Sequence, residues 1–178
     1  MKTFWQNLRQ AWQPDPPSDQ ESELAPSTRW AWVLPNKLKV GSFPEVPDLG
    51  CLKQEGVQAI LTLCDPAESR LDPAFSSSFH CLQYSLPDSR HSRPLLVEDL
   101  ATVVDLLHET LQTQGPTYVH CLAGIERSPT VCVAYLCRYQ RLQVWEALNW
   151  LKSIHARTGI TSDQLRVIST YLAEATEE

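Results

Sequence analysis

The chain has 178 residues, enough for one globular domain with modest extensions. Hydrophobic residues make up 43% and charged residues 20%, which indicates a packed core rather than a disordered chain. The net charge of −6 disfavours nucleic acid and anionic membranes as partners, and no apolar run approaches the roughly 20 residues of a membrane span. An anionic ligand must therefore be held by a local basic pocket.

Residues 1–28 are predicted to be an extension in front of a domain that covers residues 29–178. Residues 1–12 place four large apolar side chains on one side of a short amphipathic helix. Residues 13–28 contain four prolines and four acidic residues with almost nothing apolar, which is typical of a flexible linker.

The six cysteines are an even number, as in a disulfide framework, but four of them lie inside apolar runs. The start of the chain, MKTFWQNLRQAW, lacks the apolar core of a secretory signal, and a chain of this size does not depend on disulfides. We therefore expect reduced thiols in a cytoplasmic protein. We also expect a monomer that has no stable membrane association and no nucleic-acid partner.

From residue 29 onward, strand patterns alternate with helix patterns, and the last third is helical. The first two strands are joined by the turn-forming pair Pro35-Asn36, and the run VQAILTLC has the composition of a strand buried on both faces. Such an order predicts an α/β domain with a largely buried sheet. The expected strands are 29–35, 37–44, 57–64, 79–86 and 117–121, and the expected helices are 47–56, 95–113, 128–140, 143–156 and 161–175.

The segment VHCLAGIERSPT, residues 119–130, lies between a predicted strand and a predicted helix. Cys121 leaves the strand, and Pro129 stands in the first turn of the helix, where proline is tolerated. The loop between them can turn its backbone N–H groups inward and form an anion site, whose field favours a thiolate over a thiol. The segment therefore predicts a nucleophilic cysteine that faces an anionic electrophile.

The side chains of this loop fit the same chemistry. Arg127 offers a planar fork that can bind two phosphoryl oxygens, and Ser128 can donate its hydroxyl to the sulfur. His120, behind the sulfur, suits ordering of the loop better than proton transfer. The alternative is a core cysteine with an arginine nearby by chance, but the pattern HCxxGxxRS specifies five residue types at fixed spacing. The predicted substrate-binding residues are Leu122, Ala123, Gly124, Ile125, Glu126 and Arg127.

These residues resemble the signature of the cysteine-based protein tyrosine phosphatases, Cys-x5-Arg followed by Ser or Thr, and are most similar to the dual-specificity branch. The resemblance extends over residues 29–172 and is most specific at the loop. It implies a mixed, largely parallel sheet flanked by helices. It also implies hydrolysis of phosphomonoesters through a phosphocysteine, with Cys121, Arg127 and Ser128 as catalytic residues and without a metal or other cofactor.

The family mechanism also needs a general acid, because alkoxide and phenoxide are poor leaving groups. In this family the acid is an aspartate on a loop upstream of the cysteine, and Asp88 in LPDSRHSRP matches it. The alternative for Asp88 is a turn aspartate, and the other candidate acids are Asp65 and Asp72. The same loop carries a basic group that either steers phosphosubstrates or is a solvated loop: Arg90, His91 and Arg93.

Glu126 is informative about the class of substrate. A carboxylate directly before Arg127 opposes a polyanionic substrate unless its side chain points outward, and the loop has no lysine, unlike relatives that hydrolyse inositol phospholipids. We expect a shallow pocket that accepts phosphoserine, phosphothreonine and phosphotyrosine in proteins. The alternatives are non-protein substrates (phosphoinositides, phosphoglucans or RNA 5′ ends) and a non-catalytic phosphate-binding module.

Cys64 ends the apolar run 57–64. Parallel strands finish at the same edge of a sheet, so this residue is expected near Cys121. In some relatives a cysteine at this strand end closes a reversible disulfide with the nucleophile, and the resemblance implies the same role for Cys64. The alternative is a small buried hydrophobe.

Overall fold

The structure is a computed structural model that describes residues 29–90 and 93–175. The predicted extension 1–28, with its amphipathic helix and linker, lies outside these ranges, as does His91. None of the helices in the two described ranges is long and apolar enough to cross a membrane.

Strands and helices alternate along the described chain, as the sequence predicts, and each strand is shorter than its predicted segment. The short helix α3 was not predicted, because a helix of four residues is a single turn and shows no hydrophobic periodicity. The strands are β1 (Trp30–Leu34), β2 (Leu38–Gly41), β3 (Ala59–Thr62), β4 (His80–Gln83) and β5 (Thr117–His120). The helices are α2 (Asp48–Gln54), α3 (Pro73–Ser76), α4 (Val97–Thr113), α5 (Arg127–Gln140), α6 (Val144–Ile154) and α7 (Ser162–Glu174).

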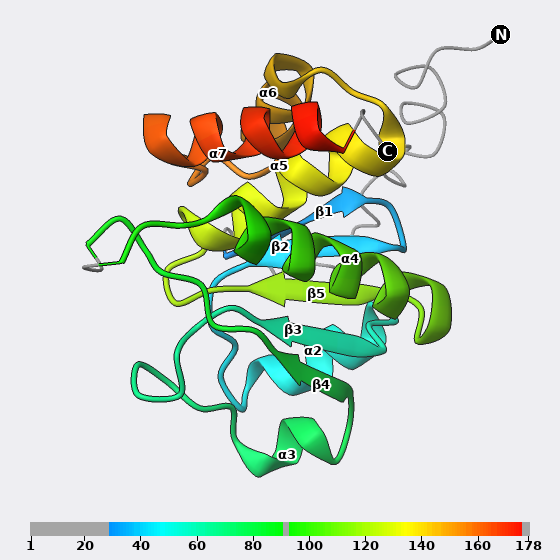
Figure 1. Cartoon of the computed structure of the whole chain (residues 1–178). Coiled ribbons are helices and arrows are strands. Elements are labelled where there is room, and N and C mark those ends of the chain that lie inside the picture. Colours follow the sequence, from blue (N-terminus) through cyan, green and yellow to red (C-terminus); the bar gives the residue numbers. More distant parts are fainter. Residues whose placement is uncertain (1–28, 91–92, 176–178) are drawn as a thin grey trace, which may run out of the picture.

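The five strands form one sheet in the order β1-β2-β5-β3-β4. Only β1 is antiparallel to its neighbour, so the predicted mixed, largely parallel sheet is confirmed. His120, the last residue of β5, is in register with Gly41 at the end of β2 and with Thr62 at the end of β3. The loops that follow the four parallel strands therefore leave from one edge of the sheet, on the left in Figure 1.

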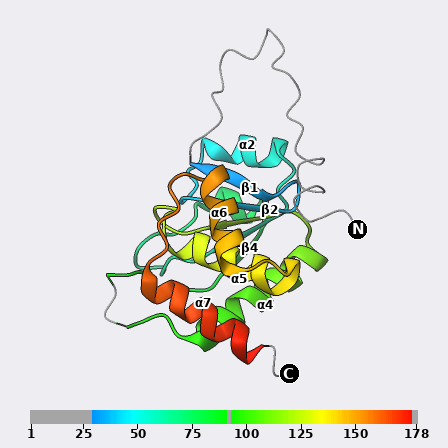
Figure 2. The same cartoon turned by 90° about the horizontal axis from the view of Figure 1, so that it is seen from above.

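Helices cover both faces of the sheet, and each face has its own hydrophobic core. The larger core lies between the sheet and helices α4, α5, α6 and α7. The smaller core lies under α2 and α3. Figure 2 shows α2 on the face of the sheet opposite to α4, α5 and α7. Neighbouring residues of a strand point to opposite faces, so Tyr118 belongs to the smaller core and Val119 to the larger. β3 is likewise buried on both faces, as predicted.

Helix α5 is the central helix of the larger layer, and α4, α6 and α7 all contact it. Its residues from Arg127 to Cys137 are all buried, which fixes its N-terminus against the sheet edge. Pro129 is the third residue of the helix. A proline is harmless there, because the N–H groups of the first turn have no partner within the helix.

Candidate active site

The loop between β5 and α5 curves around Cys121, whose surface is only 2% exposed. Gly124 makes this curvature feasible, because its φ of 70° lies in the left-handed region. The backbone of the loop also approaches the end of β2 closely. A Cβ atom on Gly124 would lie 2.7 Å from the carbonyl carbon of Gly41 and from the nitrogen of Ser42. Glycine is therefore required here for both conformation and space.

The loop is held from its outer side by hydrogen bonds to its carbonyl groups. The N–H of Phe43 donates to the oxygen of Leu122 at 3.1 Å, and the N–H of Gly159 donates to the oxygen of Ile125 at 2.9 Å. The oxygen of Glu126 accepts from the N–H and the hydroxyl of Thr130 as α5 begins. With these carbonyls bound on the outside, the loop can present its N–H groups to the inside, as an anion site requires.

Two side chains flank the sulfur of Cys121. The hydroxyl oxygen of Ser128 lies 3.3 Å from the sulfur and 3.1 Å from the carbonyl oxygen of Gly41. His120 is fully buried, with Nε2 2.9 Å from the Thr62 hydroxyl and Nδ1 3.4 Å from the Cys121 carbonyl oxygen. Burial lowers the pKa of His120 to about 3, so the ring is neutral at physiological pH. This geometry suits ordering of the strand end rather than proton transfer.

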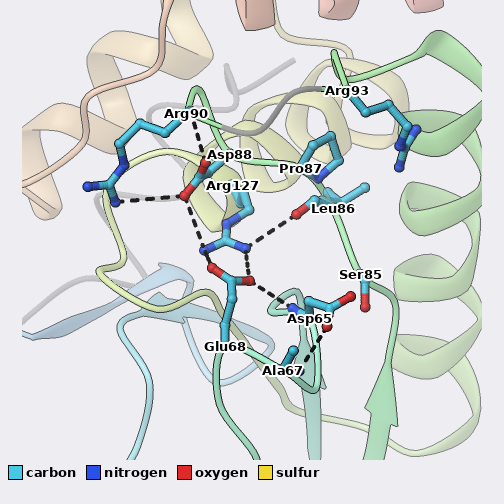
Figure 3. A pocket seen from close by; sticks show the side chains of 10 residues that line it. All are labelled: Asp65, Ala67, Glu68, Ser85, Leu86, Pro87, Asp88, Arg90, Arg93 and Arg127. Carbon is cyan, nitrogen blue, oxygen red and sulfur yellow. Dashed lines mark hydrogen bonds and ion pairs between the residues drawn. The ribbon is translucent and has the colours of Figure 1, made fainter.

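Arg127 is held from the β3–α3 loop by Glu68, a residue that sequence reasoning missed. The guanidinium donates two hydrogen bonds to the Glu68 carboxylate, at 2.6 and 3.0 Å, and a third to the carbonyl oxygen of Leu86 at 3.3 Å (Figure 3). Burial by itself would lower the pKa of Arg127, but the bonds to Glu68 and the nearby sulfur of Cys121 raise it overall. Arg127 is thus a permanent, oriented cation beside the sulfur.

Asp88 lies opposite this cation on the loop between β4 and α4. Its Oδ2 is 4.0 Å from Nη2 of Arg127 and 3.7 Å from Nη2 of Arg90, and its Oδ1 accepts a 2.9 Å hydrogen bond from the N–H of Arg90 (Figure 3). The carboxylate therefore closes a turn through one oxygen, as the alternative interpretation proposed. Its other oxygen faces the guanidinium, so the turn orients the carboxylate toward the site.

The other two candidate acids are placed differently. Asp72 caps α3 by accepting a 2.8 Å hydrogen bond from the N–H of Ala74. Asp65 accepts a 2.8 Å bond from the N–H of Ala67 and lines a neighbouring cavity. Of the three aspartates, Asp88 is the one that lines a cavity together with Cys121.

The cavity over the sulfur has a volume of about 100 Å³. Sites for drug-sized ligands measure roughly 300–1,000 Å³, so this one suits a group as small as a phosphoryl group. Gly124 does not line it, because this residue packs against the end of β2 instead. The other predicted binding residues do, and the lining comprises Asp88, Arg90, Cys121, Leu122, Ala123, Ile125, Glu126 and Arg127.

A wider cavity of about 650 Å³ adjoins the first and is drawn in Figure 3. The two share Asp88, Arg90 and Arg127, and the wider one extends to Arg93 and to the loop that carries Glu68. Two members of the predicted basic group therefore border the site, and the third, His91, is outside the described residues. The wider cavity leaves room for the body of a substrate beyond its phosphoryl group.

Cys64 lies two residues after β3 and is fully buried. Burial raises the pKa of its thiol, the neighbouring Arg127 lowers it, and Cys121 raises it further. Cys64 is thus within electrostatic reach of both key side chains of the site. Its pairing with Cys121 stays a prediction.

Comparison with known proteins agrees with this geometry. Residues 39–172 match the family described as dual specificity phosphatase, catalytic domain. The chain belongs to this family.

Two curated relatives differ in how much of the dual specificity phosphatase domain they match. The phosphatidylglycerophosphate phosphatase PTPMT2 of Arabidopsis thaliana is 27% identical over 84% of this chain and 65% of its own length. Dual specificity protein phosphatase 14 of Mus musculus is 40% identical, but over 42% of this chain and 37% of its own length. The chain therefore spans less than two thirds of the length of either relative.

Solved structures share the fold of the dual specificity phosphatase domain. The human tyrosine phosphatase-like serine/threonine/tyrosine-interacting protein superimposes with a TM-score of 0.73 at 19% identity, over 83% of this chain and 97% of the other. PTPMT1 in complex with PI(5)P gives a TM-score of 0.72 at 21% identity, again over 83% and 97%. At these identities the likeness concerns the fold alone.

Proposed function

We propose that this protein hydrolyses phosphomonoesters through a phosphocysteine intermediate. The observation that carries the proposal is the small cavity in which Cys121, Arg127 and Asp88 meet. A nucleophile, an oriented cation and a carboxylate around a space the size of a phosphoryl group are the parts that this reaction needs. A non-catalytic phosphate-binding module usually lacks at least one of these three residues.

In the first half-reaction the Cys121 thiolate attacks phosphorus, a sulfur–phosphorus bond forms and the bond to the leaving oxygen breaks. Arg127 and the loop N–H groups bind the non-bridging oxygens, whose charge they stabilise. Asp88, in its protonated form, gives its proton to the leaving oxygen. The departing group is thus an alcohol or a phenol rather than a strongly basic anion.

In the second half-reaction water attacks the phosphocysteine. Asp88, now ionised, takes a proton from that water, and the sulfur–phosphorus bond breaks to release inorganic phosphate. Ser128 lies within hydrogen-bond reach of the sulfur and can stabilise the thiolate that departs. All atoms come from the substrate and water, so the cycle returns the enzyme to its starting state.

We propose phosphoserine, phosphothreonine and phosphotyrosine in proteins as the substrates. The small volume of the cavity, about 100 Å³, supports substrates that present a single phosphoryl group to it. The second candidate is a phosphomonoester on a lipid headgroup. It is favoured by PTPMT2, a phosphatidylglycerophosphate phosphatase whose similarity covers 84% of this chain.

The reaction is tested with 4-nitrophenyl phosphate and phenyl phosphate, which have similar shapes but a good and a poor leaving group. Cys121→Ser should abolish turnover of both, and Arg127→Lys should come close to doing so, because lysine lacks the planar fork. Asp88→Asn should slow phenyl phosphate far more than 4-nitrophenyl phosphate and flatten the basic limb of the pH–rate profile. Turnover by Cys121→Ser near the wild-type rate would refute the mechanism.

The substrate class is tested by comparing kcat/KM for phosphoserine, phosphothreonine and phosphotyrosine peptides with that for phosphatidylglycerophosphate in vesicles. We expect the peptides to be hydrolysed more efficiently. A higher kcat/KM for the lipid would replace the first candidate with the second. A panel of phosphoinositides, phosphoglucans and RNA 5′ ends completes the comparison.

A further inference from the structure

Glu126, directly before Arg127, binds the loop that carries Asp88. Its two carboxylate oxygens accept separate hydrogen bonds from Ser89, one from the backbone N–H at 3.0 Å and one from the hydroxyl at 2.9 Å. Both oxygens of the carboxylate are thus bound by the opposite loop. It joins two loops that lie 37 residues apart in the sequence.

Both ends of this connection are next to key residues. Asp88 precedes Ser89, and Arg127 follows Glu126, so the Ser89–Glu126 pair runs alongside the Asp88–Arg127 pair. The two pairs together form a ladder between the loop after β4 and the start of α5.

The two loops differ in how firmly they are held. The backbone of Glu126 is fixed, because its oxygen accepts from Thr130 in the first turn of the buried helix α5. The segment from Asp88 to Arg90 is exposed to solvent over much of its surface and is closed by one turn hydrogen bond, from the N–H of Arg90 to Asp88. The Glu126 carboxylate, fixed at the start of α5, therefore restrains the Asp88 loop through its two hydrogen bonds.

We propose that Glu126 is a positioning residue. Its two hydrogen bonds to Ser89 form a clasp that holds the Asp88 loop over the phosphate cavity. The inference rests on the proposed function, because it concerns the general acid of that reaction. Glu126 acts through Ser89 and needs no contact with the substrate. The gain is geometric, since proton transfer requires the donor within hydrogen-bond reach of the leaving oxygen. A clasp of this kind lowers the barrier where protonation of the leaving group matters and has little effect where it does not.

The test uses the full chain with the variants Glu126→Ala, Glu126→Gln and Ser89→Ala, and kcat/KM for phenyl phosphate and 4-nitrophenyl phosphate. Glu109→Gln, on the exposed side of α4, is the control that removes an equal charge elsewhere. Glu126→Ala should slow phenyl phosphate about tenfold more than 4-nitrophenyl phosphate, the order expected for hydrogen bonds to a charged group. Glu126→Gln and Ser89→Ala should show smaller effects in the same direction, because each leaves part of the clasp.

Two further measurements separate a clasp from general damage to the fold. The double variant Ser89→Ala/Glu126→Ala should be no slower than Glu126→Ala alone, since both changes remove one interaction. The amide of Ser89 should exchange with deuterium faster in Glu126→Ala than in the wild type or in Glu109→Gln. Equal slowing of both phosphates, additive effects, or unchanged exchange at Ser89 would each overturn the clasp while leaving the phosphatase chemistry intact. If the wild type hydrolyses neither phosphate, the proposed function fails and the positioning role fails with it.

Discussion

Arg127 is 5% exposed, and a guanidinium so deeply buried requires a partner. Glu68 supplies it with two hydrogen bonds, and Leu86 adds a carbonyl oxygen. These bonds hold the plane of the fork in one orientation beside the sulfur. In the proposed reaction Glu68 therefore acts by orienting Arg127.

We expect Glu68→Gln to weaken transition-state binding, because an amide can accept only one of the two hydrogen bonds and cannot balance the charge of Arg127. The loss in kcat/KM for 4-nitrophenyl phosphate should be about tenfold, equivalent to ~1.4 kcal/mol. The measurement is steady-state kinetics with Glu109→Gln as the control. An unchanged kcat/KM would show that the fork is oriented by other contacts.

His120 predicts a pH dependence of stability. Its folded pKa of about 3 lies below the unfolded value near 6.5, so the unfolded chain binds more protons as the pH falls between these values. The contribution of the neutral ring is complete above pH 6.5 and is lost as the pH falls below it. The free energy of unfolding should therefore drop by about 1.4 kcal/mol from this group between pH 8 and pH 5.5.

The measurement is urea unfolding of the wild type and of His120→Gln at both pH values. The variant should lose less stability on acidification, by about the amount given above. Other groups, including the buried His155, titrate in both proteins and cancel in the comparison. An identical loss in the two proteins would mean that His120 can accept a proton in the folded state.

At the scale of elements, the site is built where the parallel strands end. The loop after β5 supplies Cys121, the loop after β3 supplies Glu68, the loop after β4 supplies Asp88, and the end of β2 lies against Gly124. In each pair of neighbouring parallel strands the last residues are in register, so the loops begin at the same level. Ligand sites gather at this edge in parallel sheets for that reason.

The loop after β3 also carries Cys64, for which we predict a redox role. A thiolate at Cys121 oxidises to a sulfenic acid, and the Cys64 thiol would displace water from it to form a disulfide. After peroxide and then thiol reductant, the wild type should regain activity and Cys64→Ser should regain little. The controls are Cys81→Ser, whose residue packs against the smaller core, and Cys132→Ala in α5. Equal recovery of wild type and Cys64→Ser would exclude this role.

At the scale of the whole molecule, the described residues already contain the two cores. They also contain the five-stranded sheet with helices on both faces (Figures 1 and 2). We therefore expect deletion of residues 1–28 to leave the fold intact and the kinetics on aryl phosphates largely unchanged. The measurements are circular dichroism, thermal unfolding and kcat/KM of residues 29–178. Loss of soluble expression would show that the extension completes the core.

The sequence by itself determined the features that depend on neighbours along the chain. The strand, loop and helix around Cys121 are contiguous, so the chemistry of HCxxGxxRS and the turn at Gly124 are encoded within a dozen residues. Long elements such as α4 are equally local, because a hydrophobic period over several turns marks the buried face. Asp88 could be proposed from its place before the signature, although Asp65 and Asp72 remained open.

Only the tertiary structure decided which side chains from separate loops meet. Glu68 reaches Arg127 across 59 positions, and Glu126 reaches Ser89 across 37. In the sequence Glu68 is an acidic residue in a polar turn, and Glu126 reads as a charge that opposes the substrate. Their partners follow from the strand order β5-β3-β4, which a pattern of apolar residues does not specify. A hydrogen bond depends on positions to within a few tenths of an ångström, and those positions are fixed only when the sheet and its helices have packed.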